Sequence, residues 1–259
     1  MKPEELLSLY DSELRREVEI TRMRREVLPG VVRYVEYGNL GGFVSWTDMN
    51  AADPDRVIDA QIAYFSPIVA DFTWKVFTHD RPADLGARLE VKGFTPRESC
   101  GLLVMDLEDA PSYLWTWDTG AVRRATRAAE IDEIMAMEIE IWHMELPHLG
   151  EGLKHDLRET PDLLSIYGVW QDGRVVSAAW QFFLAPTRWI TLHGGSTLPA
   201  YRKRGYYTAL IAARAREARE RGYRFLTVEA SPDSRPILEK HGFSYLGEML
   251  EYVWKRPGN

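Results

Sequence analysis

The sequence has little cysteine, no excess of positive charge and no long apolar run. Its one cysteine, Cys100, cannot form a disulfide within the chain, which fits a reducing, cytoplasmic location. The net charge of -7 gives no reason to expect a nucleic-acid partner, because binding to a phosphate backbone needs clustered positive charge. Neither a secretory signal nor a run of about eighteen apolar residues occurs, so we expect no membrane partner.

The composition is that of a folded protein. Apolar residues make up 45% and charged residues 27% of the chain, and 9 Trp and 12 Tyr argue against disorder. A length of 259 residues allows one large domain or two domains. Segments of helical and strand periodicity alternate, which predicts an α/β fold with a mixed sheet and helices packed on it.

The first half of the sequence predicts a complete series of elements. We expect helices over 4–26, 55–64 and 84–92, and strands over 31–37, 42–46, 72–77 and 102–107. Gly38-Asn39 is a hairpin turn between the first two strands, and Gly93 ends the third helix. Little apolar periodicity follows, and we place a linker at 111–120. Its alternating Tyr113, Trp115 and Trp117 suit a strand edge, packing of the linker or the wall of an acceptor pocket.

The second half predicts a second series. We expect strands over 122–125, 164–170, 175–183, 189–197, 225–230 and 249–254, and helices over 130–144, 206–221 and 234–241. Asp172-Gly173 is a hairpin turn, and the stretch with Pro147 and Gly150 is expected to be irregular.

The two halves resemble each other at their ends. Residues 72–76, a short helix, Gly93-Phe94 and an apolar strand match residues 225–228, a short helix, Gly242-Phe243 and an apolar strand. An internal duplication accounts for this match. This order of elements, a strand, a helix, Gly-Phe and a second strand, is also common in α/β proteins. An independent origin of the two matching segments therefore stays open.

A basic turn between a strand and a helix is the candidate binding site for an anion. It contains Arg202, Lys203, Arg204 and Gly205, and the helix begins directly after it. Backbone N–H groups at a helix start have no partner in the helix, so a pyrophosphate can accept hydrogen bonds there. The alternative is a solvated basic turn. Neither a Rossmann nor a Walker glycine motif occurs in the sequence.

The pattern Pro-x-Tyr-Arg-x-Arg-Gly-x-x-x-x-Leu, with Gly242-Phe243 some forty residues later, resembles the Gcn5-related N-acetyltransferases (GNAT) over residues 121–254. The resemblance implies the acyl-CoA N-acyltransferase fold, acetyl-CoA as cosubstrate and an amine acceptor. It also implies the cofactor-binding residues, which are Thr197, Leu198, Arg202, Lys203, Arg204, Gly205, Tyr206, Tyr207, Thr208 and Ser234. Tyr207 departs from the family, which has a small residue there, and we interpret its ring as pointing into the core.

The same resemblance implies direct attack of the amine on a thioester that lies along the strand 189–197. His193 matches a histidine that helps to take the amine proton in arylalkylamine-type members, and its ordinary pKa suits a base at neutral pH. A structural role for His193 stays open. The backbone N–H near Leu198 is the expected oxyanion donor. Leu238 stands where the family's usual acid, a tyrosine, is found, which leaves Tyr206 or Ser234 as candidates.

We therefore expect transfer of acetyl to a primary amine of a small molecule, with a protein lysine or a non-catalytic coenzyme A-sensing role as alternatives. Monomer and homodimer are both open. No metal site is expected, because His143, Glu145, His148 and His155 lack the spacing of a helical zinc motif.

The domain prediction is a degenerate GNAT-like domain at 1–110 and an acetyl-CoA-binding domain at 121–259. In the first domain the residues 48–55 take the place of the phosphate loop, and they contain three aspartates but no lysine, arginine or glycine. Carboxylates would repel a pyrophosphate and occupy the N–H groups that it needs. We expect this half to bind no coenzyme A and to pack on the second domain.

Overall fold

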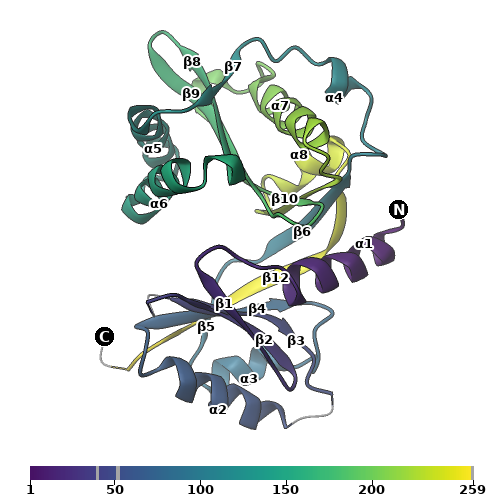
Figure 1. Cartoon of the computed structure of the whole chain (residues 1–259), viewed down its shortest axis with the longest axis vertical. Helices are drawn as coiled ribbons and strands as arrows, with labels where there is room; N and C mark the ends of the chain where they lie inside the picture. The colour runs from purple at the N-terminus through teal and green to yellow at the C-terminus, as the bar shows by residue number, and fades with distance from the viewer. Residues whose placement is uncertain (39–40, 51–52, 258–259) are drawn as a thin grey trace. The chain divides into compact units, whose positions relative to one another are not determined.

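The computed structural model describes residues 1–38, 41–50 and 53–257, and these form two compact units (Figure 1). Unit 1 comprises Met1–Leu103, Glu229–Lys240 and Ser244–Asn259, and unit 2 comprises Val104–Val228 and His241–Phe243. No helix among the described residues is long and apolar enough to cross a membrane.

Unit 1 is a sheet with helices on it. Its strands are β1 (Met23–Leu28), β2 (Val31–Glu36), β3 (Gly42–Thr47), β4 (Asp71–Phe77), β5 (Thr95–Pro96) and β12 (Ser244–Lys255). Its helices are α1 (Pro3–Tyr10), the π-helical η1 (Asp11–Arg16), α2 (Pro54–Phe65), α3 (Leu85–Val91) and α8 (Arg235–Lys240). The strand order is β1-β2-β3-β4-β12, and β5 also pairs with β12. Only β3 and β4 run parallel in the described pairs of this unit.

The predicted helix over 4–26 is wrong beyond Arg16, because the chain turns into β1. Strand β1 forms a hairpin with β2 through Gly30, whose φ is +83°. The charged residues Arg24, Arg25 and Glu26 are compatible with a helix face, but they equally suit an edge strand, where charge blocks further pairing. The predicted hairpin of β2 and β3 is confirmed. Of its turn residues, Gly38 has a φ of +89° and Asn39 lies outside the described residues.

The last strand of the chain belongs to unit 1. Residues Met249 to Lys255 of β12 pair antiparallel with Phe77 to Asp71 of β4. The compact units therefore differ from the predicted halves 1–110 and 121–259, because the sequence pattern identifies a strand but not its partner. In both halves a strand, a helix and a parallel strand follow each other, as β3-α2-β4 and as β10-α7-β11. The hypothesis of a duplication requires this correspondence.

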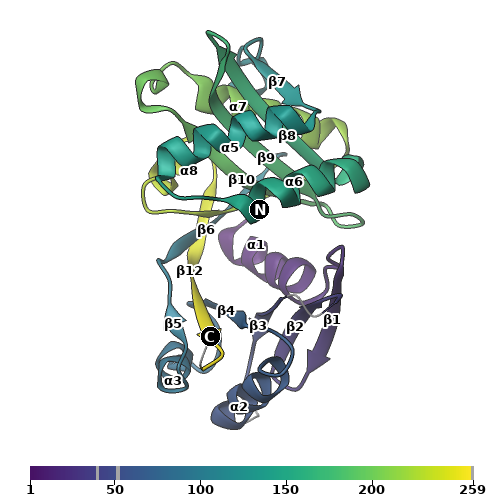
Figure 2. The same cartoon turned by 90° about the vertical axis from the view of Figure 1, so that its left-hand side faces the viewer.

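Unit 2 contains most elements of the second predicted series, whose last helix and last strand belong to unit 1. The elements in unit 2 are β7 (Val122–Ala125), α5 (Ala128–Trp142), α6 (Pro147–Glu159), β8 (Leu164–Gln171), β9 (Arg174–Phe183), β10 (Trp189–Thr197), α7 (Tyr206–Glu220) and most of β11 (Phe225–Ala230), together with α4 (Tyr113–Thr116) and the end of β6 (Cys100–Asp106). The strand order is β11-β10-β9-β8-β7. Helices α5 and α6 cover one face of this sheet and α7 covers the other (Figure 2).

The region expected to be irregular contains a helix. Helix α6 begins at Pro147, and proline suits the first position of a helix. Leu149, Leu153 and Leu157 recur at the spacing of one helix face and pack against the core of unit 2. The sequence therefore carried a helical period that Pro147 and Gly150 obscured.

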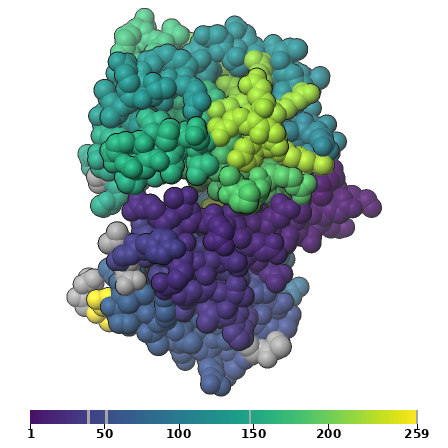
Figure 3. All heavy atoms as spheres, viewed as in Figure 1, coloured from purple at the N-terminus to yellow at the C-terminus, as the bar shows by residue number. Residues whose placement is uncertain are grey.

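The predicted linker is fixed to the domain. Residues 113–116 form helix α4, so Tyr113, Trp115 and Trp117 do not alternate as in a strand. The Arg216 guanidinium of α7 donates to the carbonyls of Leu114 and Trp117. Helix α7 lies partly at the surface, where its atoms form the yellow-green patch of Figure 3. Arg216 thus attaches the segment after β6 to α7.

Candidate functional site

The start of α7 has the geometry of an anion-binding site. Gly205 precedes the helix with a φ of +82°, and Lys203 also has a positive φ of 61°. The first amide bonded within the helix is that of Ala209, which donates to the carbonyl of Gly205. No side chain caps the helix, and its first turn contains no acidic residue. The preceding N–H groups are therefore available to an anion.

Three cations surround this helix start. Arg202 and Arg204 are exposed and donate to backbone carbonyls, Nε of Arg202 to Thr197 at 3.1 Å and Nη2 of Arg204 to Ala200 at 3.1 Å. Lys203 between them is also exposed. Across the residues that the structure describes, none of the three has an acidic partner, so their charge is not neutralised. These residues fit the pyrophosphate of a coenzyme A molecule.

Strand β10, which leads to the loop, separates from β11. The parallel pairs run from Trp189 with Phe225 to Thr191 with Thr227, and the rest of β10 pairs with β9. A bulge at Gly194 and Gly195 interrupts that second pairing, and both glycines have positive φ values of 68° and 91°. In the described strand pairs, β10 and β11 therefore separate after Thr191, as the insertion of an extended ligand requires.

The expected oxyanion donor must be corrected. The N–H of Leu198 donates to the carbonyl of Val176 at 3.0 Å, so the ladder with β9 already uses it, and the side chain is buried. In an antiparallel pair the backbone groups of successive residues point to opposite sides, so the N–H of Thr197 points away from β9. The Thr197 carbonyl accepts from Arg202, which agrees with this direction. Thr197 replaces Leu198 as the candidate backbone donor.

Tyr207 points toward the sheet. A Cβ atom on Gly195 would lie 3.0 Å from Cε2 of the Tyr207 ring, so the ring packs on the bulge. Burial raises the pKa of its hydroxyl. Thr208, next in the helix, lies 3.3 Å from Nε2 of His241, whose Nδ1 is 2.6 Å from the hydroxyl of Tyr113. The Thr208 side chain therefore makes an internal contact in unit 2.

The two candidate acids lie in different units. Tyr206 is half-buried and packs against the core of unit 2. Ser234 belongs to unit 1, where its hydroxyl donates to the carbonyl of Ser231 at 3.2 Å and its own carbonyl accepts from Leu238. These contacts are those of a residue at the start of α8. The cofactor contact of Ser234 and the acid role of either residue stay predictions.

His193 is exposed on the face of β10 that α5 covers. It lies opposite Trp180 of β9, and its ring is 5.4 Å from the ring of Phe182 at 83°. Residues directly opposite each other in an antiparallel pair share one face of a sheet. Trp180 packs with Ile134 and Met135 of α5, which identifies that face.

A carboxylate on the same face was missed in the sequence. Glu138 of α5 is only 2% exposed. Its Oε2 accepts from Oγ of Ser196 at 2.7 Å and from Nε1 of Trp142 at 2.8 Å, whereas Oε1 is buried without a partner in the part of the chain that the structure describes. Burial raises its pKa, and the two hydrogen bonds oppose this shift.

A sequence signal for Glu138 existed. Ile131, Ile134 and Met135 precede it at the spacing of one helix face, and all three are buried. The periodicity thus places a carboxylate on the apolar face of the helix.

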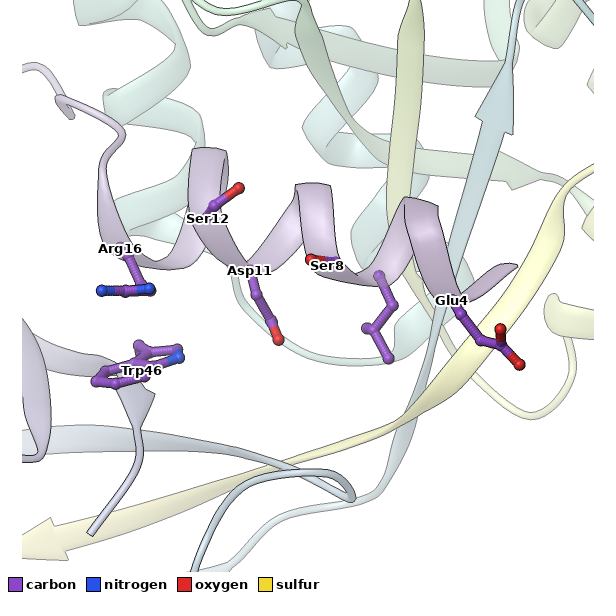
Figure 4. A pocket seen from close by; sticks show the side chains of 7 residues that line it. Glu4, Ser8, Asp11, Ser12, Arg16 and Trp46 are labelled. Carbon is purple, nitrogen blue, oxygen red and sulfur yellow. The ribbon is translucent and has the colours of Figure 1, made fainter. Parts of the chain in front are cut away.

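A cavity of about 410 Å³ lies elsewhere, in unit 1 (Figure 4). Arg16 stacks on the Trp46 ring at one end of this cavity, at 4.7 Å from its centroid. None of its lining residues belongs to the predicted cofactor or catalytic set. Groups of three or more side chains able to hold a metal ion are absent from the described residues.

Comparison with known proteins agrees with this geometry. Residues 129–243 match the model of the acetyltransferase (GNAT) family. A comparison with curated protein sequences gave no match.

Solved structures resemble the chain over most of its length. They include a functionally unknown conserved protein from Staphylococcus epidermidis (TM-score 0.65, 10% identity, 95% of this chain and 99% of that chain) and a GCN5-related N-acetyltransferase from Kribbella flavida (0.61, 16%, 92% and 90%). A tandem GNAT protein from the clavulanic acid biosynthesis pathway also matches (0.56, 11%, 93% and 86%). Identities this low establish the fold alone. Residues 129–243 therefore carry the sequence pattern of the acetyltransferase (GNAT) family, and the mixed α/β fold of GNAT proteins extends over nearly the whole chain.

Proposed function

We propose that the protein transfers the acetyl group of acetyl-CoA to a primary amine of a small molecule, by direct attack in a ternary complex. The observation that carries the proposal is the start of α7, where cations without acidic partners among the described residues surround an uncapped helix terminus, next to the strand β10. A pyrophosphate is the anion that such a site suits, and an extended arm can lie along the strand.

Different residues of unit 2 are proposed to bind acetyl-CoA and to assist the reaction. Arg202, Lys203 and Arg204, with the amides after Gly205, hold the phosphates. The N–H of Thr197 orients the thioester and stabilises the developing oxyanion. His193 assists in removing a proton from the amine. Tyr206 remains a candidate donor to the leaving thiolate.

The N-terminal half is proposed to bind no coenzyme A. Asp53 caps α2 by accepting from the N–H groups of Asp55 and Arg56 at 3.1 and 3.3 Å. These are the amides that a pyrophosphate would need at that helix. Residues 51–52 of the corresponding loop lie outside the described residues.

A second candidate function is a non-catalytic coenzyme A-binding module, because buried Leu238 stands in place of the usual acid. Release of free thiol from acetyl-CoA during incubation with primary amines separates the two. Amine-dependent release that Gly205→Asp abolishes would support the enzyme. Binding of acetyl-CoA by calorimetry without thiol release from any amine, or from a lysine peptide, would support the module.

A further inference from the structure

Glu138 has one carboxylate oxygen without a partner. Both hydrogen bonds, from Ser196 and from Trp142, reach Oε2, whereas Oε1 is buried and accepts none among the described groups. A buried oxygen of a charged group that accepts no hydrogen bond costs more free energy than that of a neutral group. A ligand that donates to Oε1 would remove this cost.

The carboxylate lies against the strand that the proposed thioester follows. Ser196, its donor, directly follows the Gly194-Gly195 bulge of β10 and directly precedes Thr197. His193 stands at the other end of the bulge on the same face of the sheet. Glu138 therefore contacts the segment of β10 at which the acceptor nitrogen must arrive.

One of the two groups that donate to the carboxylate reaches the surface. Trp142 bonds to Glu138 through its indole N–H, yet 57% of Trp142 is exposed. Helix α5 ends at Trp142, the next residue His143 has a φ of 54°, and Met144 is 56% exposed. The indole thus covers a buried acid that lies one turn from the end of its helix. Access of an acceptor to the acid requires that this side chain move.

We infer that Glu138 is the subsite for the acceptor's ammonium group and the base that takes its first proton, an inference that rests on the proposed acetyl transfer. A primary alkylammonium supplies both the missing donor to Oε1 and the missing positive charge. No charged side chain contributes to the raised pKa of Glu138, whose causes are burial and, in opposition, the bonds from Ser196 and Trp142. A carboxylate in these surroundings holds a proton more readily than a solvated one.

The transfer balances with the residues present. The carboxylate of Glu138 accepts one proton from the ammonium nitrogen. The freed lone pair then forms the C–N bond at the thioester carbonyl, the C–S bond breaks, and its electron pair leaves on sulfur. The proton on Glu138 then reaches solvent through exposed His193, which frees the carboxylate again. The second proton leaves nitrogen after the C–N bond has formed and ends on the thiol of coenzyme A.

The test compares Glu138→Gln with Glu140→Gln, an exposed residue of the same helix that undergoes the same change of charge. Thiol release is measured with n-butylamine and 2-phenylethylamine, which are cations at neutral pH, and with aniline, which is already neutral. Acetyl-CoA affinity is measured by calorimetry for all variants. We expect Glu138→Gln to lower kcat/KM for both alkylamines by about a hundredfold or more, and for aniline by less than threefold. Glu140→Gln should change neither rate.

The outcomes separate this inference from the proposed function. If wild-type protein releases no thiol with any amine, the proposed acetyl transfer fails. If wild type is active and Glu138→Gln loses less than threefold with the alkylamines, or loses as much with aniline, Glu138 is not the ammonium subsite. Folding is checked by the affinity for acetyl-CoA, which Glu138→Gln should leave within about twofold. If that affinity is lost, Glu138→Asp must show the same selective loss, and an equal loss with aniline would overturn the inference.

Discussion

The hydroxyl of Ser196 lies 2.7 Å from Oε2 of Glu138 and joins the bulged strand β10 to helix α5. The bond satisfies one oxygen of an acid that burial would otherwise leave in an apolar surrounding. Its partner oxygen stays unsatisfied among the described groups. A buried polar atom without a hydrogen-bond partner is rare in a protein core and is often part of a functional site. The face of β10 that α5 covers is therefore a candidate for such a site.

Glu138 should make stability depend on pH. Its folded pKa is raised above the ordinary value of 4.5, so the stability that it contributes is present below pH 4.5 and is lost as pH rises through the folded pKa. Glutamine does not titrate. We expect the melting temperature of Glu138→Gln, relative to that of wild type, to increase as pH rises above 4.5. At pH values above the folded pKa of Glu138 this difference should become constant.

Thermal unfolding between pH 4 and 8 measures this difference. The control is Glu140→Gln, whose melting temperature should not change in this way relative to wild type. A gap between wild type and Glu138→Gln that is constant over the whole range would contradict the burial of a raised-pKa acid.

The loop at Gly205 should be sensitive to charge more than to backbone conformation. Its φ of +82° is tolerated by Asn better than by most residues, and a Cβ there would lie 3.3 Å from the Trp117 ring. Gly205→Asp adds a carboxylate beside the proposed pyrophosphate, whereas Gly205→Asn adds nearly the same volume without charge. We expect Asp to weaken acetyl-CoA binding at least tenfold more than Asn does. Calorimetry at low salt tests this, and equal losses would mean that the loop is disturbed sterically and is not an anion site.

Much of the candidate cofactor site could be predicted from residues that are close together in the sequence. The cations, Gly205 and the helix after it are close in the chain, so their pattern predicts an anion site without knowledge of the fold. The oxyanion donor did not follow, because the direction of the Leu198 N–H depends on its register with Val176 of β9. Register and bulges are tertiary properties, and a shift of one residue turns a backbone donor to the other side.

Helices and strands could be predicted from the sequence where the periodicity was strong. The prediction was wrong where the same residues suited both a helix and a strand. Arg24, Arg25 and Glu26 have a polar pattern that a helix face and an edge strand share, and their pairing with β2 decides between them. The pairing of β12 with β4 also lies beyond the sequence, since its apolar run suits any neighbouring strand. The predicted correspondence of the two halves was visible because it depends only on the order of the elements.

His193 and Glu138 should act in one proton path. His193→Ala should lower kcat with alkylamines by about a hundredfold while the affinity for acetyl-CoA changes less than twofold. If the two residues pass the same proton, the double variant His193→Ala/Glu138→Gln should be little slower than the worse single variant. Steady-state kinetics with 2-phenylethylamine measure this. Losses that multiply would show separate roles, and a loss under threefold for His193→Ala with an unmoved pH profile would make His193 structural.

The last prediction concerns the number of cofactor sites. Helix α2 of the N-terminal half corresponds in order to α7, but the Asp53 carboxylate occupies the N–H groups of Asp55 and Arg56. A capping carboxylate and a pyrophosphate compete for the same donors and repel each other, so this half should bind no coenzyme A. Titration of acetyl-CoA should therefore give one site per chain. Gly205→Asp should remove it, whereas Asp53→Ala should lower the stability by about 1 kcal/mol and leave the stoichiometry at one. Two equivalents bound to wild type, or one that survives Gly205→Asp, would mean that the N-terminal half binds the cofactor after all.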